Sequence, residues 1–138
     1  MIRAPQEPVN AALQAFYDVL LSVLRLPQVR DGAWHLLECS PAWDGNWTSA
    51  CFVAFTWDGP AGERLLVTVN YAPNQSQCYV SLPFQDLANT NICLKDLMGS
   101  DEYFRAGNDL LSRGLYLDLP PWGYHVFTVK PEKKKATP

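Results

Sequence analysis

The sequence predicts an antiparallel Greek-key β-sandwich of about seven or eight short strands, preceded by one N-terminal α-helix. Two observations support this fold. Short segments of alternating apolar residues recur along residues 34–129, and turn residues separate them about every ten positions. Residues 8–26 instead repeat apolar side chains at every third or fourth position, which is the period of a helix.

The predicted helix runs from Pro8, which suits a first helical turn, to the residue before Pro27, which ends it. Its apolar stripe contains Val9, Leu13, Phe16, Leu20 and Leu24, widened by Ala12, Tyr17 and Val23. Such a stripe is wider than one small sheet needs. We therefore expect part of the surface that covers this helix to lie outside the chain.

The predicted sheet is organised around residues 64–73, which alternate as one strand. Leu65, Val67, Val69 and Tyr71 point to one side, and Leu66, Thr68 and Asn70 to the other. Because both sides are largely apolar, we expect a central strand that is covered on both faces. Other strands are expected at 34–39, 51–57, 78–84, 91–97, 115–119 and 124–129, with an edge piece at 102–104 and turns at 29–32 and 108–114.

Composition limits the possible functions. The chain has 138 residues, 48% of them hydrophobic and 18% charged, which predicts one globular domain. A net charge of −3 gives no electrostatic basis for binding nucleic acid or an anionic membrane. The first residues lack the apolar region of a signal peptide, which predicts a cytoplasmic location. The basic residues Lys130 and Lys133 to Lys135 are expected to belong to a solvated end.

Metal, cofactor and disulfide chemistry are not expected. The four cysteines, Cys39, Cys51, Cys78 and Cys93, form no CxxC pair, and the chain has only two histidines. We expect reduced cysteines that pack as small hydrophobic residues. His35 and His125 lie in strand patterns and are expected to be hydrogen-bonded structural residues.

Two tryptophans are candidate ligand-binding residues. Trp43 and Trp47 flank the turn Asp44-Gly45-Asn46, where aromatic and polar groups could converge on a sugar. The alternative is that one or both cover the end of the sandwich or pack on another domain. Trp34, Trp57 and Trp122 adjoin apolar strands or turns and are expected to pack in the core or at corners.

Three blocks of sequence, taken in order, resemble one family of enzymes. The first is a helix with Phe16-Tyr17 and Leu20-Leu21, followed by Arg30-Asp31-Gly32-Ala33-Trp34. The second is Phe52-Val53-Ala54-Phe55, a turn with glycine, and Arg64-Leu65-Leu66-Val67-Thr68-Val69-Asn70-Tyr71. The third is Lys95-Asp96-Leu97-Met98-Gly99-Ser100 and, further on, Leu117-Asp118-Leu119-Pro120-Pro121-Trp122-Gly123-Tyr124-His125-Val126-Phe127. Together they resemble the C-terminal end of α-amylase family glycoside hydrolases.

The resemblance implies an accessory module rather than an enzyme. In that family the last helix of a catalytic (β/α)8 barrel leads into an all-β domain, and the catalytic carboxylates lie on barrel strands. No catalytic residue can be carried over to this chain. Asp101 with Glu102, and Asp109 with Asp118, are interpreted as turn and surface residues. The implied organisation is a barrel-like helix at 1–28, a β-sandwich at 29–130 and a disordered basic tail at 131–138.

Three functional hypotheses follow. The first is a structural C-terminal domain in α-glucan metabolism that stabilises the barrel and helps to bind substrate. The second is a stand-alone module that binds α-glucan through Trp43 and Trp47. The third is a protein-interaction sandwich unrelated to sugars, which predicts a genuine start at Met1 and a defined protein partner.

Overall fold

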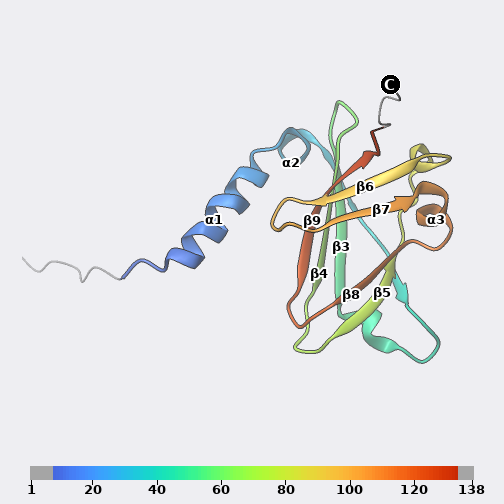
Figure 1. Cartoon of the computed structure of the whole chain (residues 1–138), viewed down its shortest axis with the longest axis horizontal. Coiled ribbons are helices and arrows are strands. Elements are labelled where there is room, and N and C mark those ends of the chain that lie inside the picture. Colours follow the sequence, from blue (N-terminus) through green and yellow to red (C-terminus); the bar gives the residue numbers. More distant parts are fainter. Residues whose placement is uncertain (1–7, 134–138) are drawn as a thin grey trace, which may run out of the picture.

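The computed structural model describes residues 8–133 and confirms a mostly β, antiparallel sandwich preceded by one main helix (Figure 1). The larger sheet contains β1 (Ala33–Leu36), β3 (Phe52–Asp58), β4 (Arg64–Asn70), β9 (Tyr124–Pro131), β6 (Asn91–Asp96) and β7 (Glu102–Ala106), in that spatial order. The smaller sheet contains β2 (Cys39–Pro41), β5 (Ser76–Val80) and β8 (Leu115–Leu119). All strand pairs are antiparallel.

The chain passes repeatedly between the two sheets. The hairpins β3–β4 and β6–β7 stay within the larger sheet, whereas β4 leads to β5 and β8 leads to β9 across the core. The last strand thus pairs with β4 on one side and with β6 on the other. Interleaving of this kind is typical of Greek-key sandwiches.

The core lies between the inner faces of the sheets and is closed by short helices. Its fully buried members include Leu66 and Phe127 from the larger sheet and Val80 and Leu115 from the smaller one. The connections contain η1 (Trp47–Cys51), η2 (Gln85–Leu87) and α3 (Gly107–Ser112). Residues 108–114 were expected to be a turn. They instead form most of α3, which buries Leu110 and ends before Gly114 in the left-handed region at φ 87°.

The N-terminal helix is shorter than its sequence pattern predicts. Helix α1 (Ala11–Leu24) begins after Asn10, whose side-chain oxygen accepts a hydrogen bond from the Leu13 amide at 3.0 Å. A second helix, α2 (Pro27–Asp31), follows where a turn was expected at 29–32. Pro27 ends the first helix because it constrains the preceding residue, and it starts the second because proline fits a first helical position.

The segment 34–39 was expected to be one strand, and that prediction was wrong. It divides into β1 and β2, which belong to different sheets, because the chain crosses the edge of the sandwich at Leu37. Leu37 is buried in the core, and its amide donates to the Ala54 carbonyl at 2.9 Å. The split brings the number of strands within residues 8–133 to nine.

Two elements extend across the expected unit boundaries. Helix α2 crosses the boundary drawn at residue 28, and β9 continues to Pro131, the first residue of the expected tail. The rest of that tail from residue 134, including Lys134 and Lys135, and the first seven residues lie outside the described part of the chain. Between residues 8 and 133, no helix is both long and apolar enough to cross a membrane.

Candidate functional site

The outer side of strands β1, β3 and β4, with the start of β9, is the most unusual surface of the described chain, because it is apolar. Residues directly opposite each other in an antiparallel pair point to the same side. The register therefore places Trp34 beside Trp57, Leu36 beside Phe55, and Val53 beside Val69. We call this surface the apolar face; its members are Trp34, Leu36, Val53, Phe55, Trp57, Val67, Val69 and Tyr124.

Several side chains of the apolar face are open to solvent. Leu36 is 67% exposed, Trp34 52% and Val53 43%. The rings of Trp34, Phe55 and Trp57 contact each other in sequence, with centroids 5.7 and 5.2 Å apart. Fixed aromatic rings that stay exposed are typical of a surface that another molecule covers.

Helix α1 extends the apolar face beyond the sheet. Figure 1 shows α1 projecting away from the strands, and Val23 near its end is its one buried residue. Val23 packs with Leu65 and Val126 in a small second core beneath α2. Phe16 contacts Tyr124 of β9 edge to face, with ring centroids 6.0 Å apart. Other apolar side chains of α1 are exposed, both within the predicted stripe and outside it: Leu13, Tyr17, Val19, Leu21 and Leu24.

The central strand is therefore covered on its outer side at one end only. Leu65 is buried beneath the helices, whereas Val67 and Val69 are half-buried and Tyr71, beyond the end of β4, is exposed. Coverage of the whole strand on both faces was expected and is not found. The wide stripe of the helix was recognisable in the sequence. The exposed apolar side of the sheet was not, because alternation does not show which side faces the core.

The tryptophans expected to pack in the core or at corners are only partly covered. Trp34 and Trp122 are about half exposed, and Trp122, in the turn before β9, makes an edge contact with Tyr71. Trp57 is half-buried and packs against the second core. The two candidate ligand-binding residues are also exposed, Trp43 by 54% and Trp47 by 68%. Trp43 lies in the turn before η1 and Trp47 is the first residue of η1, which lies beside the smaller sheet.

His125 belongs to a buried polar cluster. Its Nδ1 atom lies 2.8 Å from Asp96 Oδ2 and 3.8 Å from Asp101 Oδ2, and its ring stacks on Phe127. Asp96 Oδ1 accepts hydrogen bonds from the backbone amides of Met98 and Val126. Ligand atoms of Asp96, Asp101 and His125 lie within 4.8 Å of one another, which a metal ion could bridge. The hydrogen bonds of Asp96 to His125 and to the Val126 amide give the cluster a structural role, because they join β6 to β9.

The remaining carboxylates are divided among separate elements. Asp109 lies in α3 and Asp118 in β8, and Asp118 accepts hydrogen bonds from two glutamines. Glu102 at the start of β7 accepts a bond from the Cys93 thiol at 3.2 Å. All four cysteines are free thiols, and Cys78 is fully buried in the core.

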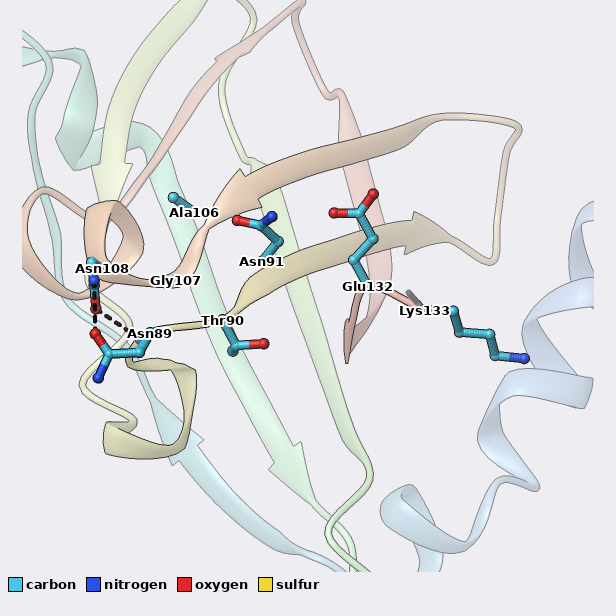
Figure 2. Close-up of a pocket in the computed structure, with 8 residues that line it drawn as sticks. All are labelled: Asn89, Thr90, Asn91, Ala106, Gly107, Asn108, Glu132 and Lys133. Carbon is cyan, nitrogen blue, oxygen red and sulfur yellow. Dashed lines mark hydrogen bonds between the residues drawn. The ribbon is translucent and has the colours of Figure 1, made fainter. Parts of the chain in front are cut away.

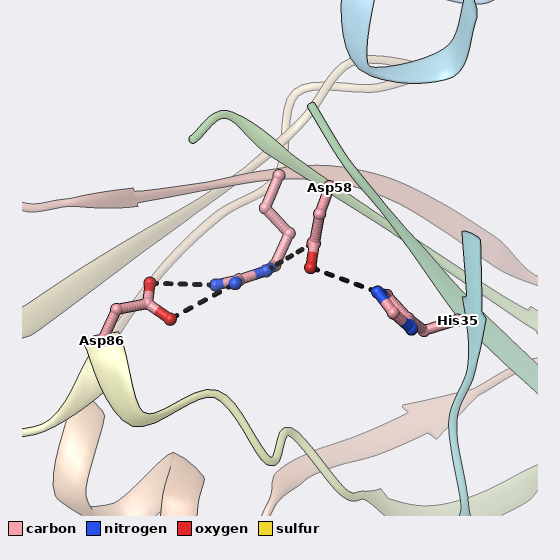
Figure 3. Close-up of polar contacts among 4 residues, drawn as sticks. His35, Asp58 and Asp86 are labelled. Atoms are coloured by element: carbon pink, nitrogen blue, oxygen red, sulfur yellow. Dashed lines mark hydrogen bonds and ion pairs between the residues drawn. The ribbon is translucent and has the colours of Figure 1, made fainter. Parts of the chain in front are cut away.

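Arg64 forms the main ion-pair network (Figure 3). Its Nε donates to Asp58 at 2.7 Å, and its two terminal nitrogens donate to Asp86 at 3.1 and 3.2 Å. The guanidinium lies 3.7 Å above the centre of the Phe84 ring, while His35 Nε2 lies 3.5 Å from Asp58. The hydrogen bonds from Arg64 hold the pKa of Asp86 below its ordinary value. The network joins β3 and β4 to η2 and has no nucleophile in it.

A shallow hollow of about 680 Å³ lies between the start of β6 and the end of β7 (Figure 2). It is lined mostly by polar groups, which are Asn89, Thr90, Asn91, Asn108, Glu132 and Lys133, with Ala106 and Gly107. Asn89 and Asn108 hydrogen-bond each other through their side chains and through the Asn89 amide. Small-molecule sites are deeper and mostly apolar, so this hollow does not resemble one.

Two comparisons with known proteins complete this description. No protein-family model matches the chain, and no curated protein matches it.

Proposed function

We propose that this chain is a non-catalytic accessory domain of an α-amylase family glycoside hydrolase, docked through its apolar face and α1 against the catalytic (β/α)8 barrel. The observation that carries the proposal is the apolar face, which adjoins an apolar helix that buries only one residue. An exposed surface of this composition marks an interface, because its exposure to water costs free energy.

The choice of a barrel as the occupant rests on the order of the three sequence blocks. They resemble a family in which a barrel helix precedes a β-domain, and α1 precedes the sandwich in the same way. Helices form the outer ring of such a barrel. The apolar face gives these outer helices an apolar surface to pack against, and α1 would itself be the last helix of the ring. The role is structural: the module stabilises the barrel and shapes access to its substrate.

The first test is the size of the native polypeptide, measured by immunoblot of the source cell with an antibody against this domain. The proposal predicts a band several times larger than 15.5 kDa, because a barrel adds about 250 residues. A band at 15.5 kDa would overturn docking within one polypeptide and would favour the third hypothesis, a sandwich that binds a separate protein.

The second test addresses the face itself. In the long polypeptide, Leu36→Lys with Val53→Lys should lower the thermal stability of the catalytic domain, because both charges would enter the interface. The matched control is Tyr116→Lys, which adds a charge at an exposed aromatic residue of β8, on the outer side of the smaller sheet. Equal effects of the two variants would contradict the assigned interface.

A further inference from the structure

The outer side of the smaller sheet differs from the apolar face and has a composition of its own. Strands β5 and β8 alternate buried and outward residues, and the register pairs Gln77 with Asp118 and Tyr79 with Tyr116. These four residues define what we call the polar face. It presents two aromatic rings, a carboxamide and a carboxylate on one flat surface.

The polar groups of this face are held in fixed positions. Asp118 Oδ1 accepts hydrogen bonds from Gln77 Nε2 at 2.9 Å and from Gln75 Nε2 at 2.7 Å. Gln77 Oε1 in turn accepts a bond from Asn46 Nδ2 at 3.0 Å. Among residues 8–133, no hydrogen bond engages the other carboxylate oxygen of Asp118. That oxygen is thus oriented and free to accept a hydroxyl group.

The same network fixes Trp47 beside the polar face. Its two neighbours in the chain both bond to Gln77: Asn46 through its side chain, and Thr48 through a hydroxyl that accepts the Gln77 amide at 3.0 Å. Asn46 also closes the turn, with its amide donating to the Trp43 carbonyl at 3.1 Å. The backbone that carries this indole, which is 68% exposed, is therefore held next to Gln77.

The tyrosines extend this arrangement along the sheet. The rings of Tyr79 and Tyr116 lie 5.4 Å apart, and Arg113 donates to the Tyr79 hydroxyl at 2.9 Å. Arg113 and Asp118 bring one charge of each sign, so the surface as a whole favours a neutral ligand. Exposed rings bind the C–H faces of sugars, and fixed amides and carboxylates bind their hydroxyl groups.

We infer that the polar face, with Trp47 at its edge, is a binding site for a neutral glycan chain. One sugar ring stacks on Trp47 while its hydroxyl groups bond to Asp118 and Gln77, and a neighbouring ring rests on Tyr116. The site is independent of the docking proposal, because it lies on the opposite sheet from the apolar face.

The inference is tested with the full chain by NMR titration of backbone amides. The probes are maltoheptaose and cellohexaose, an α-linked and a β-linked glucan, each raised to ten millimolar, with the charged polymer heparin as a third ligand. A millimolar dissociation constant, which is about −4 kcal/mol of binding free energy, is expected for one of the two neutral glycans. The shifted amides should cluster in β5, β8 and η1.

Two variants and a control make the test specific. Trp47→Ala and Tyr116→Ala should each weaken binding at least tenfold, while circular dichroism stays unchanged because both side chains are exposed. Trp122→Ala is the control, since Trp122 is also more than half exposed but lies in the turn between β8 and β9, where it pairs with Tyr71. Saturation by either neutral glycan with this pattern supports the inference.

Three results would overturn it: no shifts with either glucan, binding of heparin alone, or amide shifts confined to another surface. An unchanged affinity in both Trp47→Ala and Tyr116→Ala would also do so. None of these results bears on docking to a barrel, which is decided by the size of the native polypeptide and by the variants of the apolar face.

Discussion

The two sheets of the sandwich turn chemically different outer faces to their surroundings. The apolar face of the larger sheet carries tryptophan, leucine and valine with hardly a hydrogen-bonding group between them. The polar face of the smaller sheet carries tyrosine, glutamine and aspartate, joined by hydrogen bonds. In our proposals, an apolar partner covers the first face, and a hydroxyl-rich ligand binds the second.

The difference shows that an exposed aromatic residue can indicate either an interface with an apolar partner or a site for a polar ligand. Trp34 and Trp47 are similarly exposed, yet their neighbours differ. Trp34 is surrounded by other apolar side chains, so any partner that covers it gains free energy by excluding water. Trp47 stands beside fixed polar groups, which give direction to a ligand as well as contact area.

The largest loss of stability is expected at Leu65, on the outer side of β4 where the helices cover it. Leu65→Ala should lower the free energy of unfolding by about 2–5 kcal/mol, because Leu65 is completely buried beneath the helices. Leu36→Ala, on the same side but exposed, should change it by less than about 0.5 kcal/mol. Urea denaturation followed by tryptophan fluorescence measures both. Equal losses would mean that the whole face is covered in the free chain.

A moderate loss of stability is expected for a substitution on the polar face of the smaller sheet. Gln77→Ala removes the side chain that links Asn46 to Asp118, and should cost about 1 kcal/mol of stability. Gln75→Ala is the control, because Gln75 bonds Asp118 without reaching the Trp43–Trp47 turn. The same urea titration compares them. If the control lost as much as Gln77→Ala, the turn would not depend on Gln77.

A smaller and pH-dependent effect is expected from the charged network at the end of the sandwich. The pKa of Asp86 is lowered in the folded chain by its bonds to Arg64, so this pair stabilises the fold above the unfolded pKa of about 3.9. The stabilisation is lost as the pH falls through the lowered pKa.

Asp86→Asn should therefore cost less than about 1 kcal/mol at pH 7, since the carboxylate is exposed, and nothing once the carboxyl group is protonated. Urea titrations of wild type and variant between pH 7 and pH 2 measure this difference. A stability difference between wild type and variant that grows toward acid pH would contradict the lowered pKa of Asp86.

The smallest effect on stability is expected for Leu36→Lys with Val53→Lys. Both side chains are exposed, so the free energy of unfolding of the free chain should change by less than about 0.5 kcal/mol. Binding of the dye ANS, which reports accessible apolar surface, should nevertheless fall. Unchanged dye fluorescence would show that the apolar face is not the accessible surface we describe.

Much of the fold could be predicted from the sequence, because alternation within strands is a local property. Cys78 and Val80, like Leu115 and Leu117, alternate cleanly and are buried as expected. The side of a strand that meets the core is not local. It depends on where the other sheet lies, and Phe55 and Trp57 therefore give no sign in the sequence that they face outward.

The candidate sites show the same limit. Trp43 and Trp47 could be singled out because two aromatic residues flank a polar turn. Their polar partners could not, since Gln77 is 31 residues from Asn46 and 41 from Asp118. The buried partner of His125, Asp96, is likewise 29 residues away. Such pairs come together only through strand pairing across the chain.

Because α1 is exposed, the hydrogen exchange of its amides can be used to detect a bound partner. A helix of 14 residues is marginal in water unless one of its sides is packed, and α1 packs little more than Val23. Its amide hydrogens should consequently exchange with solvent far faster than those of β4, which lies in the middle of the larger sheet. A molecule that covers α1 together with the apolar face should slow that exchange, so the protection of α1 would report whether the proposed partner is bound.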